Sequence, residues 1–328
     1  MDVPFETSRM GDLRIAHAPR VPAAAVSQAI ALHRENFARG RAACLHWGPG
    51  SSVSRVRIDG EAGPLDLAVK WNPWRGWRGA LSDGFHGSRA QRAWAASLRL
   101  APTDLLQPEV LALAERRRFG VVRESFLLTR FVEGADPLPV AMARRAAARA
   151  PRRALLRAVG EAIGRLHAQG LDHRDLKHSN LLVDTSARIA FLDLEALGRL
   201  SPRSRSRRAR ALGVLEAFAR DLYPWLPARE RACFLRAYLR AQPGLGGREA
   251  LVRDAQRAAE QRLARWARRE SERHAQRHFP LVPRDALACR DESAAGARSD
   301  GRMPGATPDA RPAAGCPGSG SMQCSTER

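Results

Sequence analysis

Apolar and polar positions alternate along several short stretches in the first part of the chain. Valine and isoleucine recur across 53–58, and leucine and valine fill every second position of 65–69, which is typical of strands with one buried face. A segment rich in glycine and proline separates these stretches and predicts a turn. Two further strands are expected near 109–114 and 125–131, joined by a hairpin connection at 116–120. The pattern therefore predicts a small antiparallel sheet.

The second half of the chain has helical periodicity instead. Leu155, Val159, Ile163 and Leu166 fall on one helical face, and Gly170 marks the end of that helix. Further helices are expected at 23–37, 88–100, 207–222, 228–240 and 248–278, and short strands at 181–183 and 189–192. Together these patterns predict an α+β fold of two lobes, a small antiparallel β lobe followed by a mainly helical one.

Changes in composition divide the chain into four parts. We expect an N-terminal extension at 1–40, a first lobe at 41–134 and a second lobe at 135–283, with a hinge around 132–137. From residue 284 onward the chain has no Ile, Val, Phe, Tyr or Trp. The segment 284–328 is therefore expected to be a disordered tail.

Two motifs in the second half carry candidate chemistry. Residues 173–180 read His-Arg-Asp-Leu-Lys-His-Ser-Asn, and residues 191–195 read Phe-Leu-Asp-Leu-Glu. Both resemble the catalytic loop and metal-binding motif of protein-kinase-like folds. In such a site Asp175 orients an acceptor hydroxyl and accepts its proton, while Lys177 reaches the transferring phosphate. Asn180 and Asp193 supply the oxygen ligands that Mg²⁺ prefers.

The nucleotide side of this site draws on the first lobe. The predicted cofactor-binding residues are Lys70, Gly48, Gly50, Ser51 and Glu133. Lys70 is expected to reach the α- and β-phosphates of ATP. The glycines let backbone N–H groups approach phosphates, although Pro49 removes one donor and an ordinary tight turn explains the segment nearly as well.

One part of the kinase pattern is missing. Kinases pair the strand lysine with a glutamate on the following helix, but the expected helix at 88–100 contains no acidic residue. Either Lys70 is held by Asp193 and nucleotide alone, or a carboxylate arrives from elsewhere. Glu195 stands where the metal motif usually has glycine, and is either a further metal-side ligand or a solvated acid; we favour the solvated acid.

Arginine supplies nearly all of the positive charge. The chain has 55 basic and 34 acidic residues, a formal net charge of +21 and a pI near 11.4. Its two lysines are Lys70 and Lys177, which strengthens the predicted site because guanidinium replaces a compact ammonium poorly. Such a charge favours anionic partners. The main arginine run has no interleaved aromatic residues, which argues against nucleic acid.

The cysteines and the hydropathy indicate the cellular compartment. Five cysteines without a Cys-x-x-Cys pair argue against a disulfide framework or a zinc site and fit a reducing environment. The first 22 residues have no apolar core of signal-peptide type, and no run approaches 18 apolar residues. We therefore expect a cytoplasmic protein.

Beyond the catalytic motifs, residues 40–275 resemble the bacterial lipopolysaccharide kinase family, the Kdo and heptose kinases and their relatives. The likeness rests on the lysine strand with its Trp/Arg loop and on the segments 87–90, 130–135, 173–183, 192–195 and 234–238. It implies phosphorylation of a sugar hydroxyl by ATP and Mg²⁺ on an anionic glycolipid acceptor. It also implies peripheral contact with the cytoplasmic face of the inner membrane.

The length of the segment after the metal motif distinguishes protein kinases from kinases of small or glycan acceptors. About a dozen residues lie between Asp193 and the next expected helix, whereas protein kinases dock a peptide on a longer segment that ends in an Ala-Pro-Glu-like anchor. A sugar acceptor is therefore favoured. An atypical protein Ser/Thr kinase and a catalytically silent nucleotide-binding scaffold are the alternatives, the latter because of the missing helix glutamate.

Overall fold

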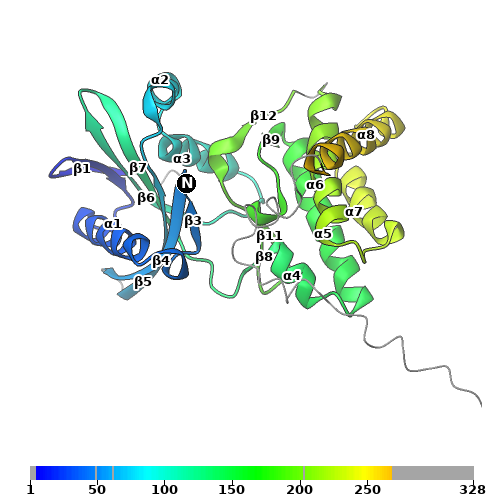
Figure 1. Cartoon of the computed structure of the whole chain (residues 1–328), viewed down its shortest axis with the longest axis horizontal. Coiled ribbons are helices and arrows are strands. Elements are labelled where there is room, and N and C mark those ends of the chain that lie inside the picture. The colour runs from blue at the N-terminus through cyan, green and yellow to red at the C-terminus, as the bar shows by residue number, and fades with distance from the viewer. Residues whose placement is uncertain (1–4, 49, 61–62, 202–203, 268–328) are drawn as a thin grey trace, which may run out of the picture. The chain divides into compact units, whose positions relative to one another are not determined.

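The structure is a computed structural model, and it describes residues 5–48, 50–60, 63–201 and 204–267. These residues form a first lobe built on a sheet and a second, mainly helical lobe (Figure 1). The predicted α+β class is confirmed. The expected tail at 284–328 and the last part of the helix expected at 248–278 lie outside the described residues.

The first lobe contains a seven-stranded antiparallel sheet in the order β1-β2-β6-β7-β5-β4-β3. Its strands are β1 (Glu6–Met10), β2 (Leu13–His17), β3 (His46–Gly48), β4 (Ser51–Gly60), β5 (Gly63–Asn72), β6 (Val110–Arg118) and β7 (Val121–Arg130). β4 and β5 form the hairpin that the alternating pattern predicted, and β5 pairs with β7 on its other side. The backbone that carries Lys70 is therefore held by hydrogen bonds from two neighbouring strands.

The sheet begins earlier in the chain than the sequence indicated. β1 pairs with β2, β2 pairs with β6, and α1 (Ala23–Ala38) packs against β4. Residues 6–38, expected as an extension ahead of the first lobe, thus belong to its sheet and core. The alternating pattern of β2 is short, because its buried aliphatic positions are Leu13 and Ile15. Two such positions are too few to indicate a strand from the sequence.

A buried histidine joins α1 to β4. His33 lies between two serine hydroxyls, with 3.0 Å from Nε2 to Ser52 Oγ and 2.6 Å from Nδ1 to Ser54 Oγ. Burial, with a smaller contribution from Arg34, lowers the pKa of His33 to about 4, so the ring is neutral at neutral pH. The contact fixes the first residues of β4, which follow the turn after β3.

Two helices follow β5, where the sequence predicted a loop and one helix. α3 (Arg89–Leu100) is the expected helix, and it starts with a capping box in which Ser88 and Gln91 bond each other's backbone N–H at 3.1 Å. α2 (Gly76–His86) occupies a segment that included the end of an expected loop. It was missed because Gly79 and Gly84 lower its helix propensity.

The β6–β7 turn is tighter than the hairpin connection expected at 116–120. β6 continues through Arg118, and the turn consists of Phe119 and Gly120, with φ of 52° and 77°. Positive φ at both central residues is what two-residue hairpin turns require. Phe119 therefore stands at the tip of a long hairpin.

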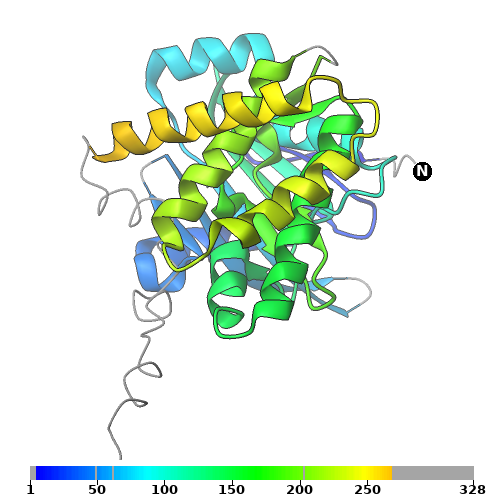
Figure 2. The ribbon, with the colours of Figure 1, turned by 90° about the vertical axis from the view of Figure 1, so that its right-hand side faces the viewer.

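The second lobe consists mainly of α4 (Leu138–Arg144), α5 (Arg149–Ala168), α6 (Arg205–Leu222), α7 (Ala228–Arg240) and α8 (Arg248–Ala267). α5 packs on α7, and α6 packs on α8 (Figure 2). A Cβ on Gly160 would lie 2.2 Å from the Phe234 carbonyl oxygen, so α7 approaches α5 more closely than an alanine allows. Among the described residues, no helix has both the length and the apolar character of a bilayer-spanning segment.

Short strand pairs bring the two sequence motifs together. β9 (Leu171–His173) pairs with β12 (Leu197–Arg199), and β10 (Leu181–Val183) pairs with β11 (Ile189–Phe191) and β8 (Asp136–Pro137). The first motif forms the loop between β9 and β10, and the second forms the turn between β11 and β12. Because each motif is flanked by strands of both pairs, the two turns lie side by side.

Candidate active site

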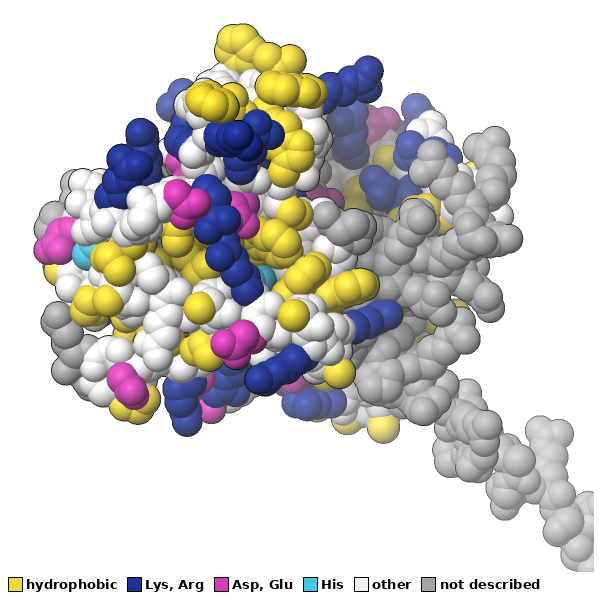
Figure 3. Space-filling model, turned by 60° about the vertical axis from the view of Figure 1, so that its left-hand side comes forward, with side chains coloured by type: hydrophobic (Ala, Val, Ile, Leu, Met, Phe, Trp, Pro, Cys, Tyr) yellow, Lys and Arg dark blue, Asp and Glu magenta, His cyan; other side chains and the backbone are white. Residues whose placement is uncertain are grey.

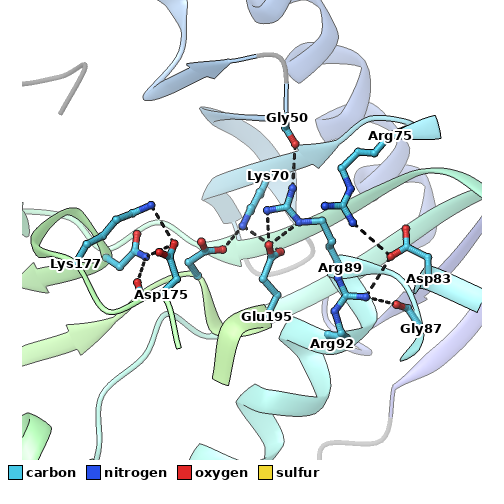
Figure 4. A network of polar contacts seen from close by, with 12 residues as sticks. Gly50, Lys70, Arg75, Asp83, Gly87, Arg89, Arg92, Asp175, Lys177 and Glu195 are labelled. Carbon is cyan, nitrogen blue, oxygen red and sulfur yellow. Dashed lines mark hydrogen bonds and ion pairs between the residues drawn. The ribbon is translucent and has the colours of Figure 1, made fainter. Parts of the chain in front are cut away.

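Lys70 lies at the centre of a charged cluster to which both lobes contribute (Figure 4). Its Nζ donates to Asp193 Oδ1 and, at 3.2 Å, to Glu195 Oε2. The side chains of Lys70, Asp193 and Glu195 are 18%, 22% and 11% exposed, so the cluster is largely shielded from water. Lys70 and Asp193, predicted from separate segments, are thus brought into contact.

Glu195 supplies the carboxylate that the helix lacks. Its Oε2 accepts from Lys70, and its Oε1 accepts from Arg89 Nε at 2.5 Å. The interpretation of Glu195 as a solvated acid is therefore wrong, because both oxygens are bonded and the side chain is mostly buried. The helix after the lysine strand contributes a cation, Arg89, and the acid comes from the last position of the metal motif.

Arg89 also joins α3 to the glycine segment of the first lobe. Its Nη1 donates to the Gly50 carbonyl oxygen at 2.9 Å. Gly48 and Ser51 pair across the turn between β3 and β4. The predicted phosphate-contacting segment is therefore a hairpin tied to the charged cluster through Gly50.

His46 of β3 lies in the electrostatic surroundings of the cluster, which the sequence analysis did not anticipate. Burial lowers its pKa, and the positive charges of Lys177 and Lys70 lower it further. Those charges act on His46 from both lobes, so the β3–β4 hairpin lies within electrostatic reach of the catalytic loop. A lone histidine two residues before Gly48 carried no motif that could have identified it.

Asp193 has an unusual backbone and a perturbed carboxyl group. Its φ and ψ are 56° and 45°, a left-handed conformation that non-glycine residues seldom adopt. Burial opposes ionisation, but the charges of Lys70 and Arg89 together outweigh it, so the pKa of Asp193 lies below its ordinary value. Asp193 is thus an anion at neutral pH, oriented by a strained turn toward the cluster.

In the catalytic loop, two side chains bond Asp175. Lys177 Nζ donates to Asp175 Oδ2 at 3.0 Å, and Asn180 Nδ2 donates to the Asp175 carbonyl oxygen at 2.8 Å and to Oδ2 at 3.3 Å. The Asp175 side chain is 52% exposed, whereas Asn180 is buried. The Asp175 carboxylate is therefore oriented by its neighbours and still accessible to a second substrate.

Two hydrogen bonds to backbone carbonyl groups hold the two motifs against each other. His173 Nε2 donates to the Leu192 carbonyl oxygen at 2.7 Å, and the Leu192 N–H donates to the Asn180 carbonyl oxygen at 2.9 Å. His173 also stacks on Phe191, with ring centroids 6.5 Å apart. These contacts fix the position of Asp193 relative to the loop that carries Asp175.

Asn180 and Asp193 fit a hard cation. The amide nitrogen of Asn180 is bonded to Asp175, which leaves its amide oxygen as the atom that can bind a metal. Over the described ranges of the chain, no three His, Cys, Asp or Glu side chains gather into a metal site of protein ligands alone. The donor set therefore fits Mg²⁺, which takes its remaining ligands from phosphate and water.

Glu133 is the predicted site residue that the structure does not bring to the cluster. Its side chain is 79% exposed and contacts Arg55 of β4 at 3.4 Å. Its carboxylate therefore lies apart from Lys70, on the connection between the lobes.

A groove of about 570 Å³ lies between α6 and α8. Its basic lining residues are Arg210, Arg257, Arg262 and Arg265. Burial lowers the pKa of Arg262, repulsion from Arg265 lowers it further, and the attraction of Asp175 opposes both. The catalytic loop is therefore within electrostatic reach of this basic groove.

Comparison with known proteins identifies a family to which the central part of the chain is similar. The family model described as "Lipopolysaccharide kinase (Kdo/WaaP) family" matches residues 78–238, which include α3, the hinge and both motifs. No curated protein matches the sequence significantly. A solved structure, "WaaP in complex with acyl carrier protein", is 23% identical, with a TM-score of 0.46, and the alignment covers 66% of this chain and 87% of that one. The family match shows that residues 78–238 of this chain belong to the lipopolysaccharide kinase (Kdo/WaaP) family of phosphotransferases.

Proposed function

We propose that this protein transfers the γ-phosphate of ATP to a sugar hydroxyl of an anionic glycan, with lipopolysaccharide core as the acceptor. The observation that carries the proposal is the cross-lobe cluster of Lys70, Asp193 and Glu195 beside the Asp175 loop. Membership of a kinase family implies ATP. Mg²⁺ and the identity of the acceptor are part of the proposal.

On the nucleotide side, Lys70 binds the α- and β-phosphates, and the backbone of Gly48, Gly50 and Ser51 lines their path. Glu195 and Arg89 keep the ammonium in place: Glu195 bonds it directly, and Arg89 bonds Glu195. Asn180 and Asp193 would hold Mg²⁺, which when bound would neutralise charge on the phosphates. The chain's own contribution is to fix these groups before ATP arrives.

On the acceptor side, Asp175 orients the hydroxyl and accepts its proton as the oxygen attacks the γ-phosphorus. The bond from that phosphorus to the bridging oxygen of the β-phosphate breaks, and ADP leaves. Its exposure leaves room for the acceptor, and its hydrogen bond from Asn180 fixes its orientation. Lys177 bonds Asp175 before substrate arrives. Its flexible stem lets it turn to the transferring phosphate, where an ammonium stabilises the charge that develops.

The groove between α6 and α8 is the proposed acceptor site. Arginine forks bind phosphate and carboxylate groups bidentately. The groove presents Arg210 and Arg262, and Arg262 interacts electrostatically with Asp175. The acid in the groove, Asp254, is paired with Arg205 at 2.9 Å. A glycan that carries negative charges next to its reactive hydroxyl matches this lining.

The structure disfavours the two alternatives. Between Asp193 and α6, the described residues form a short turn, β12 and its connection to Arg205, which leaves no peptide-docking platform of protein-kinase type. The silent-scaffold hypothesis rested on the missing helix glutamate, and Glu195 bonds Lys70 instead.

The test incubates the full chain with ATP, Mg²⁺ and purified core oligosaccharide, and measures the gain of one phosphate by mass spectrometry. Asp175→Asn is the control: it should lower the rate of transfer by about a thousandfold while Mg-ATP still raises the melting temperature. Phosphate found only on polypeptide would instead support a protein kinase. Thermal stabilisation by millimolar Mg-ATP without phosphate transfer to any acceptor would support the silent nucleotide-binding scaffold, and no stabilisation would contradict ATP binding altogether.

A further inference from the structure

α2 presents a stripe of large apolar side chains to solvent. Trp77, Leu81 and Phe85 are 69%, 63% and 84% exposed. They are spaced four residues apart, so they lie along one face of the helix. No residue of α2 is buried, and the stripe is therefore not packed on the sheet of its own lobe.

The length and composition of α2 give the helix little stability of its own. It has only 11 residues and contains Gly79 and Gly84 in its interior. Helices of this length are marginal in water, and most helical stability in proteins comes from burial of an amphipathic face. Two interior glycines weaken the helix further. A partner that covers the stripe would supply the missing burial.

The surroundings of the stripe are basic. Arg75 and Arg78 flank Trp77 in the sequence, and Arg123 lies over the Trp74 ring at 4.2 Å and the Trp77 ring at 5.9 Å. The acid of α2, Asp83, is bonded to Arg92 at 3.1 Å and lies 3.9 Å from Arg75. Figure 3 shows hydrophobic and basic side chains gathered at the upper end of the molecule, where α2 lies.

A second apolar side chain projects from the neighbouring hairpin. α2 contacts β7, and the turn that precedes β7 carries Phe119, which is 89% exposed. The residues before it are Arg116, Arg117 and Arg118. The hairpin tip thus repeats the combination found on α2, an exposed aromatic ring beside arginines.

We propose that α2, assisted by the Phe119 turn, docks the protein on an anionic lipid bilayer. Helices that lie in the bilayer interface combine an apolar face containing Trp, Phe and Leu with flanking Arg or Lys. Indole rings favour this zone, and arginines are attracted to anionic headgroups. The occupant is a lipid surface and not an acidic protein, because Trp77, Leu81 and Phe85 form an exposed row along the helix. The pocket beside α2 is lined by Ala80 and Asp83 and by none of these three side chains. This inference concerns a surface apart from the Asp175 loop and does not depend on the proposed reaction.

The experiment must separate insertion of the stripe from attraction of a chain with a net charge of +21. The full chain is mixed with vesicles of equal parts phosphatidylglycerol and brominated phosphatidylcholine, without ATP, and tryptophan quenching is recorded. We expect quenching that persists at about 0.5 M salt, where attraction between exposed charges is largely screened. Trp77→Phe should keep vesicle binding and lose much of the quenching, because the reporter is removed and the apolar face is kept.

Affinity is compared in a matched pair of variants. Leu81→Gln should weaken vesicle binding at high salt by about tenfold, and Phe85→Gln added to it should weaken binding further. Leu98→Gln changes a leucine that is 48% exposed on α3, and it should leave binding unchanged. Circular dichroism of each variant checks that the helices are intact.

Three results would overturn the proposal: absence of quenching in the unaltered chain, equal binding by the Leu81→Gln/Phe85→Gln variant, or an equal loss with Leu98→Gln. Light scattering adds a fourth. If the unaltered chain is a dimer that the double variant converts to a monomer without a change in vesicle binding, the stripe is an interface between copies of the chain.

Discussion

The two charged regions of this molecule are organised in opposite ways. Around Lys70, each of the four charged side chains contacts one of opposite sign, and each is less than a quarter exposed. In the groove between α6 and α8, Arg210 and Arg262 form no ion pair with a carboxylate over the residues that the structure describes. The first region is closed and self-compensated, and the second is open and carries surplus positive charge.

The two regions therefore suit different tasks: the cluster around Lys70 holds reacting groups in fixed positions, and the groove attracts anions. A partly buried, fully paired cluster fixes each group in one place, and removal of one member leaves a charge without a partner in a poorly solvated site. An open basic groove holds no fixed geometry but draws in anions, and salt screens it. We infer that the closed cluster governs how fast the reaction proceeds and that the groove governs how well the acceptor binds.

The largest expected effect lies where the two regions meet. Asp175→Asn keeps the shape and the bond to Asn180 but removes the proton acceptor, so kcat should fall by about a thousandfold. The KM for ATP should change little, because Asp175 faces the acceptor. Steady-state kinetics with ATP and acceptor varied separately test this. A variant that loses ATP affinity instead would place Asp175 in the nucleotide region.

The closed cluster is tested by a double-mutant cycle of Arg89→Gln and Glu195→Gln. Each change alone should lower kcat/KM for ATP by about a hundredfold, because Glu195→Gln weakens the bond to Lys70 and Arg89→Gln leaves Glu195 less firmly placed to bond it. The double variant should be about as impaired as the worse single variant, since the two residues act on one group. Additive losses would show that they act independently.

The neighbouring pair Asp83 and Arg92 is the matched control. It joins α2 to α3 by a similar bond at 3.1 Å and does not contact Lys70. Asp83→Asn with Arg92→Gln should leave kcat/KM for ATP nearly unchanged. A loss equal to that of the Arg89/Glu195 pair would mean that the position of α3, and not its link to Lys70, controls the reaction.

The pH dependence of Mg-ATP binding should show that the low pKa of Asp193 depends on Lys70. Burial alone raises the pKa of Asp193, and the lysine reverses that direction. In Lys70→Met the pKa should therefore rise, and protonation should begin at a higher pH. The Mg-ATP affinity of the variant, measured by calorimetry, should fall by up to about tenfold per pH unit on acidification. The unaltered chain should show a shallower decline over the same range, and parallel curves would contradict the coupling.

The sequence predicted those parts of the fold and site in which the signal is local. Alternation gave the β4–β5 hairpin, the expected helices at 207–222 and 228–240 match α6 and α7 with nearly correct ends, and helical periodicity with Gly170 gave the C-terminal end of α5. The catalytic loop was recognisable because a short motif holds its residues at fixed spacing. Lys70 was added because the chain has so few lysines. The contact between Lys70 and Asp193 was expected only from the resemblance to kinases, and the structure shows it directly.

What the sequence could not give depends on pairing across long separations. Glu195 bonds Lys70 across 125 positions and Arg89 across 106, and no local pattern distinguishes such an acid from a solvated one. β2 joins the sheet by pairing with β6 about a hundred residues later. α2 was missed for a different reason: its apolar stripe faces solvent, and its glycines mark it as a loop.

The smallest effects are expected in the open groove. Arg210→Gln and Arg262→Gln should each raise the KM for the acceptor by about fivefold, because each removes one charge from a site that keeps several. The KM for ATP and kcat should stay nearly constant. Arg229→Gln, on the exposed side of α7, is the matched control, since it removes the same charge away from the groove.

Salt distinguishes specific attraction from general charge. The acceptor KM of the unaltered chain should rise with ionic strength, and the two groove variants should show a weaker rise because fewer charges remain to be screened. If Arg229→Gln flattens the salt dependence as much as Arg262→Gln does, the whole surface attracts the acceptor and the groove has no special role. If neither groove variant changes the acceptor KM, the acceptor binds elsewhere, and surplus charge between α6 and α8 is not what separates this region from the cluster around Lys70.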